Sequence, residues 1–112
     1  MNNPYPMSAV RAEDTATDLK CVVARPVLRY LEHVLGANQM REIIASTRMH
    51  LPYLENGNNW ISFDYYCRLL ERLVEATGDS HAPYTASRNY TNRQTYSTVE
   101  SFLTRLASPV TT

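Results

Sequence analysis

Glycine and lysine are scarce in this chain, and both shortages restrict what it can do. Three glycines in 112 residues cannot build the glycine-rich loop that surrounds a phosphate with backbone N–H groups. Lys20 is the single lysine, and eleven positive side chains are balanced by eleven negative ones. This neutral balance argues against sequence-independent binding to DNA or RNA, which requires a basic surface, and against a polybasic membrane anchor. No apolar run is long enough for a membrane span.

Cysteine is equally rare, and the two present do not suggest a metal site. Cys21 and Cys67 match no ligand spacing. Cys67 falls on an apolar helical stripe, which favours a small core side chain, and a Cys21–Cys67 disulfide stays open as an alternative. The first twenty residues contain no apolar run typical of a secretory signal. We therefore expect a cytoplasmic protein in a reducing compartment.

Residue types used in catalysis are present, but not in an arrangement that indicates a reaction. His33, His50 and His81 have no second ligand at helical spacing, so no metal or haem site is expected. Glu71 and Glu75 are four residues apart on a charged helix face, which is typical of a solvated surface rather than an acid–base pair. No nucleophile motif is present. We expect that the chain is not an enzyme and uses no cofactor.

The clearest helical pattern runs from Ser62 to Gly78. Ser62 can cap the start of this helix, and Gly78 can adopt the left-handed conformation that ends it. The opposite face is charged, and Asp64 precedes Arg68 by four residues, the order that favours an ion pair. The apolar positions recur every three or four residues and predict one buried stripe: Phe63, Tyr66, Cys67, Leu70, Leu73 and Val74.

Shorter patterns predict further helices on either side of this one. One covers residues 25–35 and ends at Gly36, and a second covers 39–47 after a cap at Asn38. A weaker helix is expected from about Pro83. A last one follows the capping box that Ser97 begins, with Glu100 three residues later, and its apolar stripe is Val99, Phe102, Leu103 and Leu106.

Residues 49–61 interrupt the helices and are predicted to form a lid over the core. Pro52 and the turn at Asn56–Gly57 exclude one continuous helix. A small β-hairpin at this turn is the alternative. The side chains expected to fold back onto the helices are Leu51, Leu54, Trp60 and Ile61.

Together these patterns predict an all-α fold, an irregular bundle of four or five short helices in a single domain. Residues 1–24 are polar near the start and are interpreted as a flexible leader. Residues 25–109 are interpreted as the helical module. No strand alternation of useful length occurs.

Aromatic residues of the lid and of the main helix are the candidate contacts for a ligand or partner. We expect Tyr53, Trp60 and Tyr65 to lie where the lid meets the main helix, and Tyr and Trp are enriched at sites where partners bind. A partner helix or a small apolar ligand could dock there. Self-association into a homodimer through the same surface is a related hypothesis.

Binding to nucleic acid is the alternative function. Helices 25–35 and 39–47 with their short connection resemble a helix-turn-helix, and residues 84–96 alternate tyrosine with arginine, a pattern that can stack on single strands. Arg41, Arg48, Arg88 and Arg93 would make the contacts. The neutral charge balance argues against this alternative.

The run LPYLENGNNWISFDYYCRLLERLVEATGD resembles the helical N-terminal effector regions of bacterial AraC-type regulators. It is similar also to the N-terminal input modules of bacterial sensors such as histidine kinases and cyclases. The matching positions are Leu54 to Ile61, Phe63 to Val74, and the sequence Thr-Gly-Asp at 77–79. The resemblance implies a module for signal transduction or transcription regulation without catalytic residues, whose partner is another protein or an output domain following Pro109.

Overall fold

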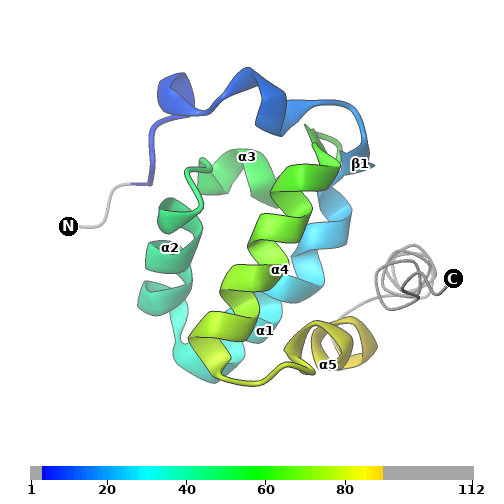
Figure 1. Cartoon of the computed structure of the whole chain (residues 1–112). Helices are drawn as coiled ribbons and strands as arrows, with labels where there is room; N and C mark the ends of the chain where they lie inside the picture. The colour runs from blue at the N-terminus through cyan, green and yellow to red at the C-terminus, as the bar shows by residue number, and fades with distance from the viewer. Residues whose placement is uncertain (1–3, 90–112) are drawn as a thin grey trace, which may run out of the picture.

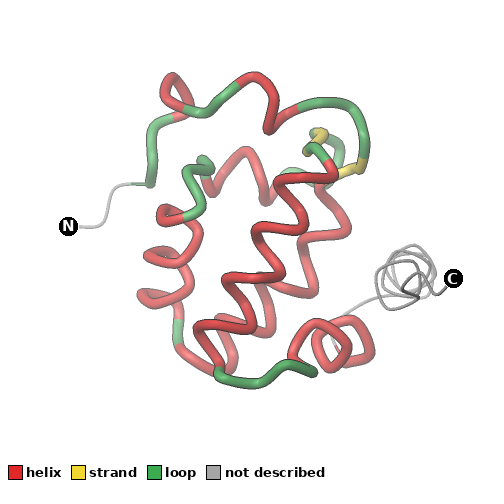
Figure 2. The backbone as a smooth tube through the Cα atoms, in the orientation of Figure 1, coloured by secondary structure: helices red, strands yellow, loops and turns green. Residues whose placement is uncertain are grey.

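The computed structural model describes residues 4–89, and these form a small bundle of α-helices around one core (Figure 1). The prediction of an all-α fold is confirmed. Only a two-stranded ribbon interrupts the helices and loops of the described part (Figure 2). The α-helices are α1 Arg25–Leu35, α2 Ala37–Ser46, α3 Leu51–Glu55, α4 Phe63–Thr77 and α5 Ala82–Asn89. The 3-10 helices are η1 Met7–Ala9, η2 Ala12–Thr15 and η3 Cys21–Ala24, and the strands are β1 Leu19–Lys20 and β2 Trp60–Ile61.

Helices α1 and α2 turn sharply against each other at Gly36, as expected. Pro26 lies in the first turn of α1, where its missing N–H costs no hydrogen bond. Gly36 has φ 92° and ψ 160°, a backbone region that residues with a Cβ avoid. Helix α2 begins directly after it at Ala37 rather than at Gln39, so Asn38 lies inside the first turn instead of capping it.

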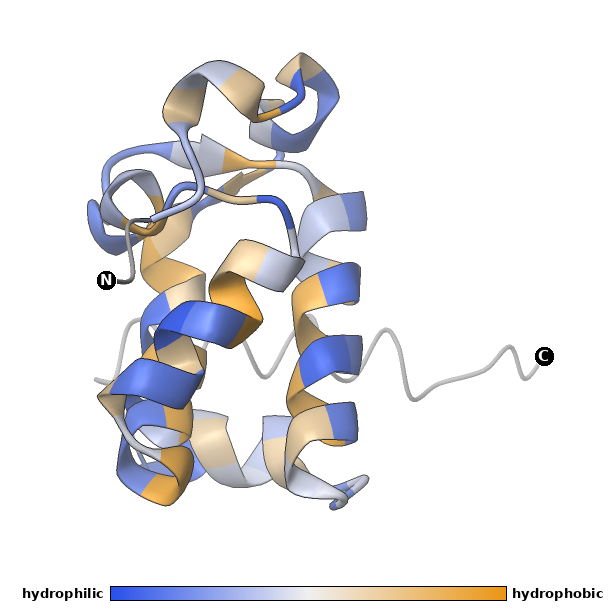
Figure 3. Cartoon of the chain, turned by 90° about the vertical axis from the view of Figure 1, so that its left-hand side faces the viewer, coloured by the Kyte–Doolittle hydropathy of each residue, from blue (hydrophilic) through white to orange (hydrophobic). Residues whose placement is uncertain are grey.

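Both predicted ends of α4 are confirmed. The Ser62 hydroxyl accepts a hydrogen bond from the Tyr65 N–H at 2.9 Å, and Gly78 ends the helix in the left-handed region with φ 68°. Asp18 adds a second cap, because its carboxylate accepts from the Phe63 N–H at 3.0 Å. Figure 3 shows the result: the apolar side of α4 faces into the bundle and its charged side faces outward.

The buried face of α4 is rotated from the predicted one. Phe63, Cys67 and Val74 are only half-buried. This stretch carries more aromatic and aliphatic residues than one face can hold, so packing against the neighbouring helices selects among them. The residues that enter the core are Tyr65, Tyr66, Leu69, Leu70 and Leu73.

The predicted lid is partly helical. Pro52 lies in the first turn of α3, and Leu51, Leu54 and Ile61 are buried as expected. Trp60 is instead 37% exposed. In β2, Trp60 pairs with Lys20 of β1, and Ile61 pairs with Leu19. Strands of two residues are too short to show an alternating apolar pattern, so the sequence did not indicate this pairing.

The segment before α1 is packed onto the bundle, in contrast to the flexible leader expected for residues 1–24. Cys21, Val23 and Ala24 are core residues, and the Asp14 side chain is only 2% exposed. The Asp14 carbonyl accepts a hydrogen bond from the Ser62 N–H at 2.9 Å. The chain from η2 onward therefore belongs to the same packed unit as the helices.

Helix α5 closes the lower end of the bundle against α1 and α4 (Figure 1). It begins next to the expected Pro83, and Ala82 and Ala86 are buried. The predicted helix after Ser97 and the module boundary at residue 109 lie outside the described residues.

Candidate functional site

A groove between α1, α2 and α3 is a candidate site within residues 4–89. It has a volume of about 420 Å³, within the range of small-molecule sites. It is open to solvent on one side. The lining residues come from all three helices: Arg25, Leu28, Arg29, Glu32, Met40, Arg41, Leu51, Leu54 and Glu55.

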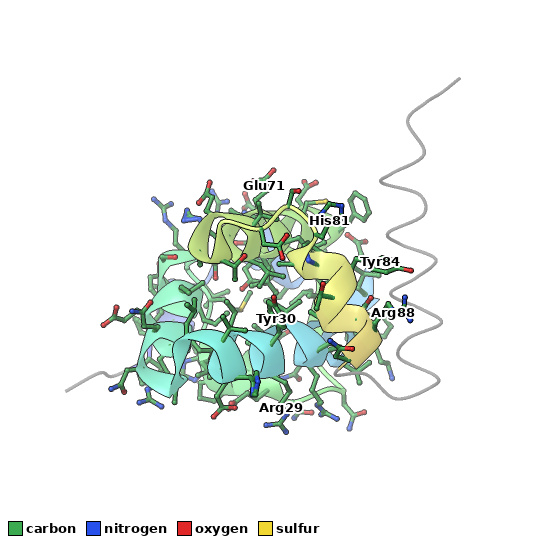
Figure 4. All side chains as sticks on the ribbon, turned by 90° about the horizontal axis from the view of Figure 1, so that it is seen from below. Arg29, Tyr30, Glu71, His81, Tyr84 and Arg88 are labelled. Carbon is green, nitrogen blue, oxygen red and sulfur yellow. The ribbon has the colours of Figure 1, made fainter. Side chains whose placement is uncertain are left out.

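One face of α1 forms the longest wall of this groove. The lining positions 25, 28, 29 and 32 recur at intervals of three and four residues, which places them on one side of a helix. In Figure 4, Arg29 projects from the side of α1 that is turned away from α4, whereas the next residue, Tyr30, points toward the space between α1, α4 and α5. One face of α1 therefore packs in the core, and another face lines the groove.

The floor of the groove is apolar and belongs to the core. Leu28, Met40 and Leu51 are between 5% and 9% exposed, and Leu54 is 1% exposed. These side chains are held by packing against the rest of the core, so their positions are fixed before any ligand arrives. A molecule in the groove would contact three helices at once.

The rim is charged, with three arginines and two glutamates. Arg29 and Glu32 lie one turn apart with an N–O distance of 3.9 Å, and Arg41 donates a hydrogen bond to the neutral side chain of Asn38. Among residues 4–89, Arg25 and Glu55 make no side-chain hydrogen bond or ion pair. The Arg25 guanidinium lies close to Gly57, where an added Cβ would be 3.2 Å from Nη2.

Two of the three predicted contact residues, Tyr53 and Trp60, are neighbours. The Tyr53 hydroxyl donates to the Trp60 carbonyl at 2.7 Å, and the Asn59 side chain donates to the Tyr53 carbonyl at 2.9 Å. Lys20 places its ammonium 5.4 Å from the centre of the Trp60 ring. Tyr53 therefore fastens the 56–60 turn onto α3, and Trp60 forms a partly exposed corner beside it.

Tyr65, the third predicted contact, is fully buried and cannot touch a ligand at the surface. Its hydroxyl lies 2.8 Å from the Thr47 hydroxyl. Burial raises the pKa of the Tyr65 hydroxyl above its ordinary value, and the hydrogen bond with Thr47 and the nearby Arg68 oppose that shift. The ring is core, because the buried face of α4 is rotated from the predicted stripe.

Arg68 was expected on the solvated face with Asp64, but it pairs with a residue distant in sequence. Its guanidinium donates to the buried Asp14 carboxylate at 2.8 Å and to the Thr47 carbonyl at 3.3 Å. It also lies 5.2 Å from the centre of the Tyr65 ring. This network joins the N-terminal segment, the turn after α2 and α4, and its role is to hold them together.

The arginines of the nucleic-acid alternative do not share one surface. Arg41 lines the groove, and Arg48 is exposed after α2 in a positive-φ conformation. Arg88 lies on α5, on the other side of the bundle from α2 (Figure 1), with its guanidinium 5.7 Å from the centre of the Tyr84 ring. Figure 4 shows that Tyr84 and Arg88 project outward from the same side of α5. Arg93 lies outside the described residues.

Neither cysteine is activated. Burial raises the pKa of the Cys21 thiol to about 12, and burial together with Asp64 and Glu71 raises the pKa of the Cys67 thiol. Both thiols are free. A raised pKa keeps a thiol protonated at neutral pH and suppresses its nucleophilicity.

Metal-binding geometry does not occur within residues 4–89, where no three His, Cys, Asp or Glu side chains cluster. His33 and His81 are exposed, while His50 hydrogen-bonds through Nδ1 to the Tyr5 carbonyl at 2.8 Å. No helix of the same range is long and apolar enough to cross a bilayer.

The Thr-Gly-Asp sequence that contributes to the family resemblance has a structural role here. The Thr77 hydroxyl donates to the Leu73 carbonyl at 2.8 Å, Gly78 reverses the chain, and the Asp79 carboxylate accepts from the His81 N–H at 2.9 Å. These three residues end α4 and lead into α5. They form a turn rather than a binding site.

The sequence did not predict the groove, because its lining residues fall in the predicted helices 25–35 and 39–47 and in the 49–61 lid, and the predicted site lay between the lid and the main helix instead. One signal was available in the sequence. Arg25 and Arg29 are four residues apart, and like charges at this spacing destabilise a helix unless a partner compensates. That Arg41 and Glu55 line the same groove depends on how three helices pack.

Comparisons with known proteins add no identification. A scan against protein-family models, a search of curated proteins and a search of solved structures each returned no match.

Proposed function

We propose that this chain is a regulatory or sensory helical module of a bacterial signalling or transcription-regulating protein, and that it acts by binding in the groove between α1, α2 and α3. The observation that carries the proposal is the groove itself, with a preformed apolar floor and a charged rim. The family resemblance of residues 54–79 supports the regulatory part of the proposal.

Regulation through this groove has a simple physical basis. Its floor and rim come from three short helices whose connections are the tight turn at Gly36 and the segment around Arg48. A bound molecule would hold the three helices together and favour one relative arrangement. Because α1 also packs against α4 and α5, a change in its position would be transmitted to the opposite side of the bundle.

Ligand-detected and protein-detected NMR with a library of small fragments would test the proposal. We expect amide shifts to cluster on α1, α2 and α3. Glu32→Trp places a large ring on the groove rim and should abolish these shifts. Glu71→Trp is the matched control, since Glu71 projects away from the bundle on α4 (Figure 4). Shifts that survive Glu32→Trp, or a library that never perturbs the groove, would refute the proposal.

Binding to nucleic acid is tested in the same preparation by a gel shift at two salt concentrations. Binding through phosphates weakens steeply as salt rises. We expect no retarded band at either concentration, because the arginines concerned are dispersed over the bundle. Strong salt-sensitive retardation that is lost in Arg41→Gln and Arg48→Gln would replace the groove proposal with the alternative.

A further inference from the structure

The charges on the groove rim restrict what the groove can bind. Glu32 lies beside Arg29, so that pair is nearly neutral as a unit. The remaining rim charges are Arg25 and Arg41, neither paired with a carboxylate among the described residues, against the single carboxylate of Glu55. The rim therefore has a net positive charge.

Arg25 is the rim charge that an anion would compensate most directly. Arg29, four residues after Arg25 on the same groove wall, already has Glu32 as its counter-charge, whereas Arg25 has none among the described residues. Guanidinium groups bind carboxylates through two parallel hydrogen bonds. A carboxylate at the rim would supply the counter-charge that the described part of the chain lacks beside Arg25.

We propose that the groove binds a small organic carboxylate with an apolar body. The carboxylate would accept hydrogen bonds from Arg25 and Arg41, and the apolar body would rest on Leu28, Met40 and Leu51. This inference depends on the proposed function, because it names the chemistry of the molecule that the same groove takes. Glu55 disfavours a second negative charge at its side of the rim, so the ligand is a monocarboxylate.

Octanoate, octylammonium and acetate are suitable probes. Octanoate and octylammonium have the same chain and opposite charge, and acetate has the carboxylate without the apolar body. In NMR titrations of the whole chain, we expect octanoate to shift groove amides more strongly than either of the others. Arg25→Gln and Arg41→Gln should each weaken octanoate binding about tenfold, the order expected for losing a hydrogen bond to a charged group.

Arg72→Gln is the matched control, because Arg72 lies on α4, outside the groove lining, beside the exposed Glu75. It should leave octanoate binding unchanged. Stronger binding of octylammonium, equal binding of acetate, or octanoate shifts away from α1, α2 and α3 would each overturn the carboxylate assignment. The fragment experiment above then decides separately whether the groove binds anything, since its readout does not depend on ligand charge.

Discussion

Replacing Arg68 with glutamine tests whether the N-terminal segment is held on the bundle by a buried ion pair. The Arg68 guanidinium donates to Asp14 at 2.8 Å, and the Asp14 side chain is 2% exposed. Glutamine is a helix former comparable to arginine, so the substitution leaves the propensity of α4 almost unchanged. It removes the principal counter-charge of a buried carboxylate.

The expected magnitude follows from the burial of the two partners. Removing one member of a buried pair costs about 3–5 kcal/mol, because the other charge stays desolvated. Here the Arg68 side chain keeps 27% exposure and Arg11 remains 3.8 Å from Asp14. We therefore expect Arg68→Gln to lower the free energy of unfolding by about 2–3 kcal/mol. Asp14→Asn should cost about 1–2 kcal/mol, since the freed guanidinium can reach water.

Urea unfolding of the wild type, both single variants and the double variant measures the coupling. We expect a coupling energy of about 1–2 kcal/mol for Asp14 and Arg68. The control cycle uses Arg72 and Glu75, which are 3.9 Å apart and solvent-exposed, and should give less than about 0.5 kcal/mol.

Trypsin provides a second readout, independent of global stability. Release of the N-terminal segment in Arg68→Gln should accelerate cleavage after Arg11 and Lys20 under native conditions. A coupling no larger than that of the control pair, together with unchanged cleavage at these two sites, would refute the idea that the pair holds the segment in place.

Three further predictions concern a helix cap, a turn and a buried thiol. Ser62→Ala removes the side-chain cap of α4 and should cost about 1 kcal/mol in urea unfolding, and a loss below about 0.3 kcal/mol would show that the Asp18 cap compensates fully. Gly36→Ala should destabilise by about 1–3 kcal/mol and more than Gly78→Ala, because both sites have open space for a Cβ but only Gly36 combines φ 92° with ψ 160°, and the opposite order would contradict this. Burial raises the pKa of Cys21 from 9.0 to about 12, so above pH 9.0 the unfolded chain loses a proton that the folded chain keeps. The contribution of the Cys21 thiol to the free energy of unfolding is therefore complete below pH 9.0, the pKa of the thiol in the unfolded chain. It is lost as the pH rises from 9.0 toward about 12, the pKa of the thiol in the folded chain. Cys21→Ala should reduce this slope by up to about 1.4 kcal/mol per pH unit, and identical alkaline profiles for the two proteins would show that the thiol does not contribute.

Local signals in the sequence accounted for most helix boundaries. Pro26, Gly36, Ser62 and Gly78 act on backbone conformation within one turn of the chain, and each lies where its chemistry predicts. The second-helix cap was misplaced at Asn38 because Gly36 supplies the preceding turn, so that α2 starts one residue after it.

The candidate site was predicted only in part. Tyr53 and Trp60 were expected to lie together and do. Tyr65 was expected beside them but is core. Periodicity can assign a residue to a helix face, but a helix with apolar side chains over a wide arc has several orientations that bury similar area. Packing against the neighbouring helices selects one of these orientations.

The order of α1, α2, α4 and α5 and the turn at Gly36 followed from the sequence alone, because caps, prolines and glycines act over a few residues, whereas α3 and the β1–β2 pairing did not. Tertiary packing decided three other features: the side of α4 that faces inward, the pairing of Arg68 with Asp14, and the groove between α1, α2 and α3. Each of these brings together residues from separate elements, and their energies depend on distances and burial that arise only when the helices pack against one another.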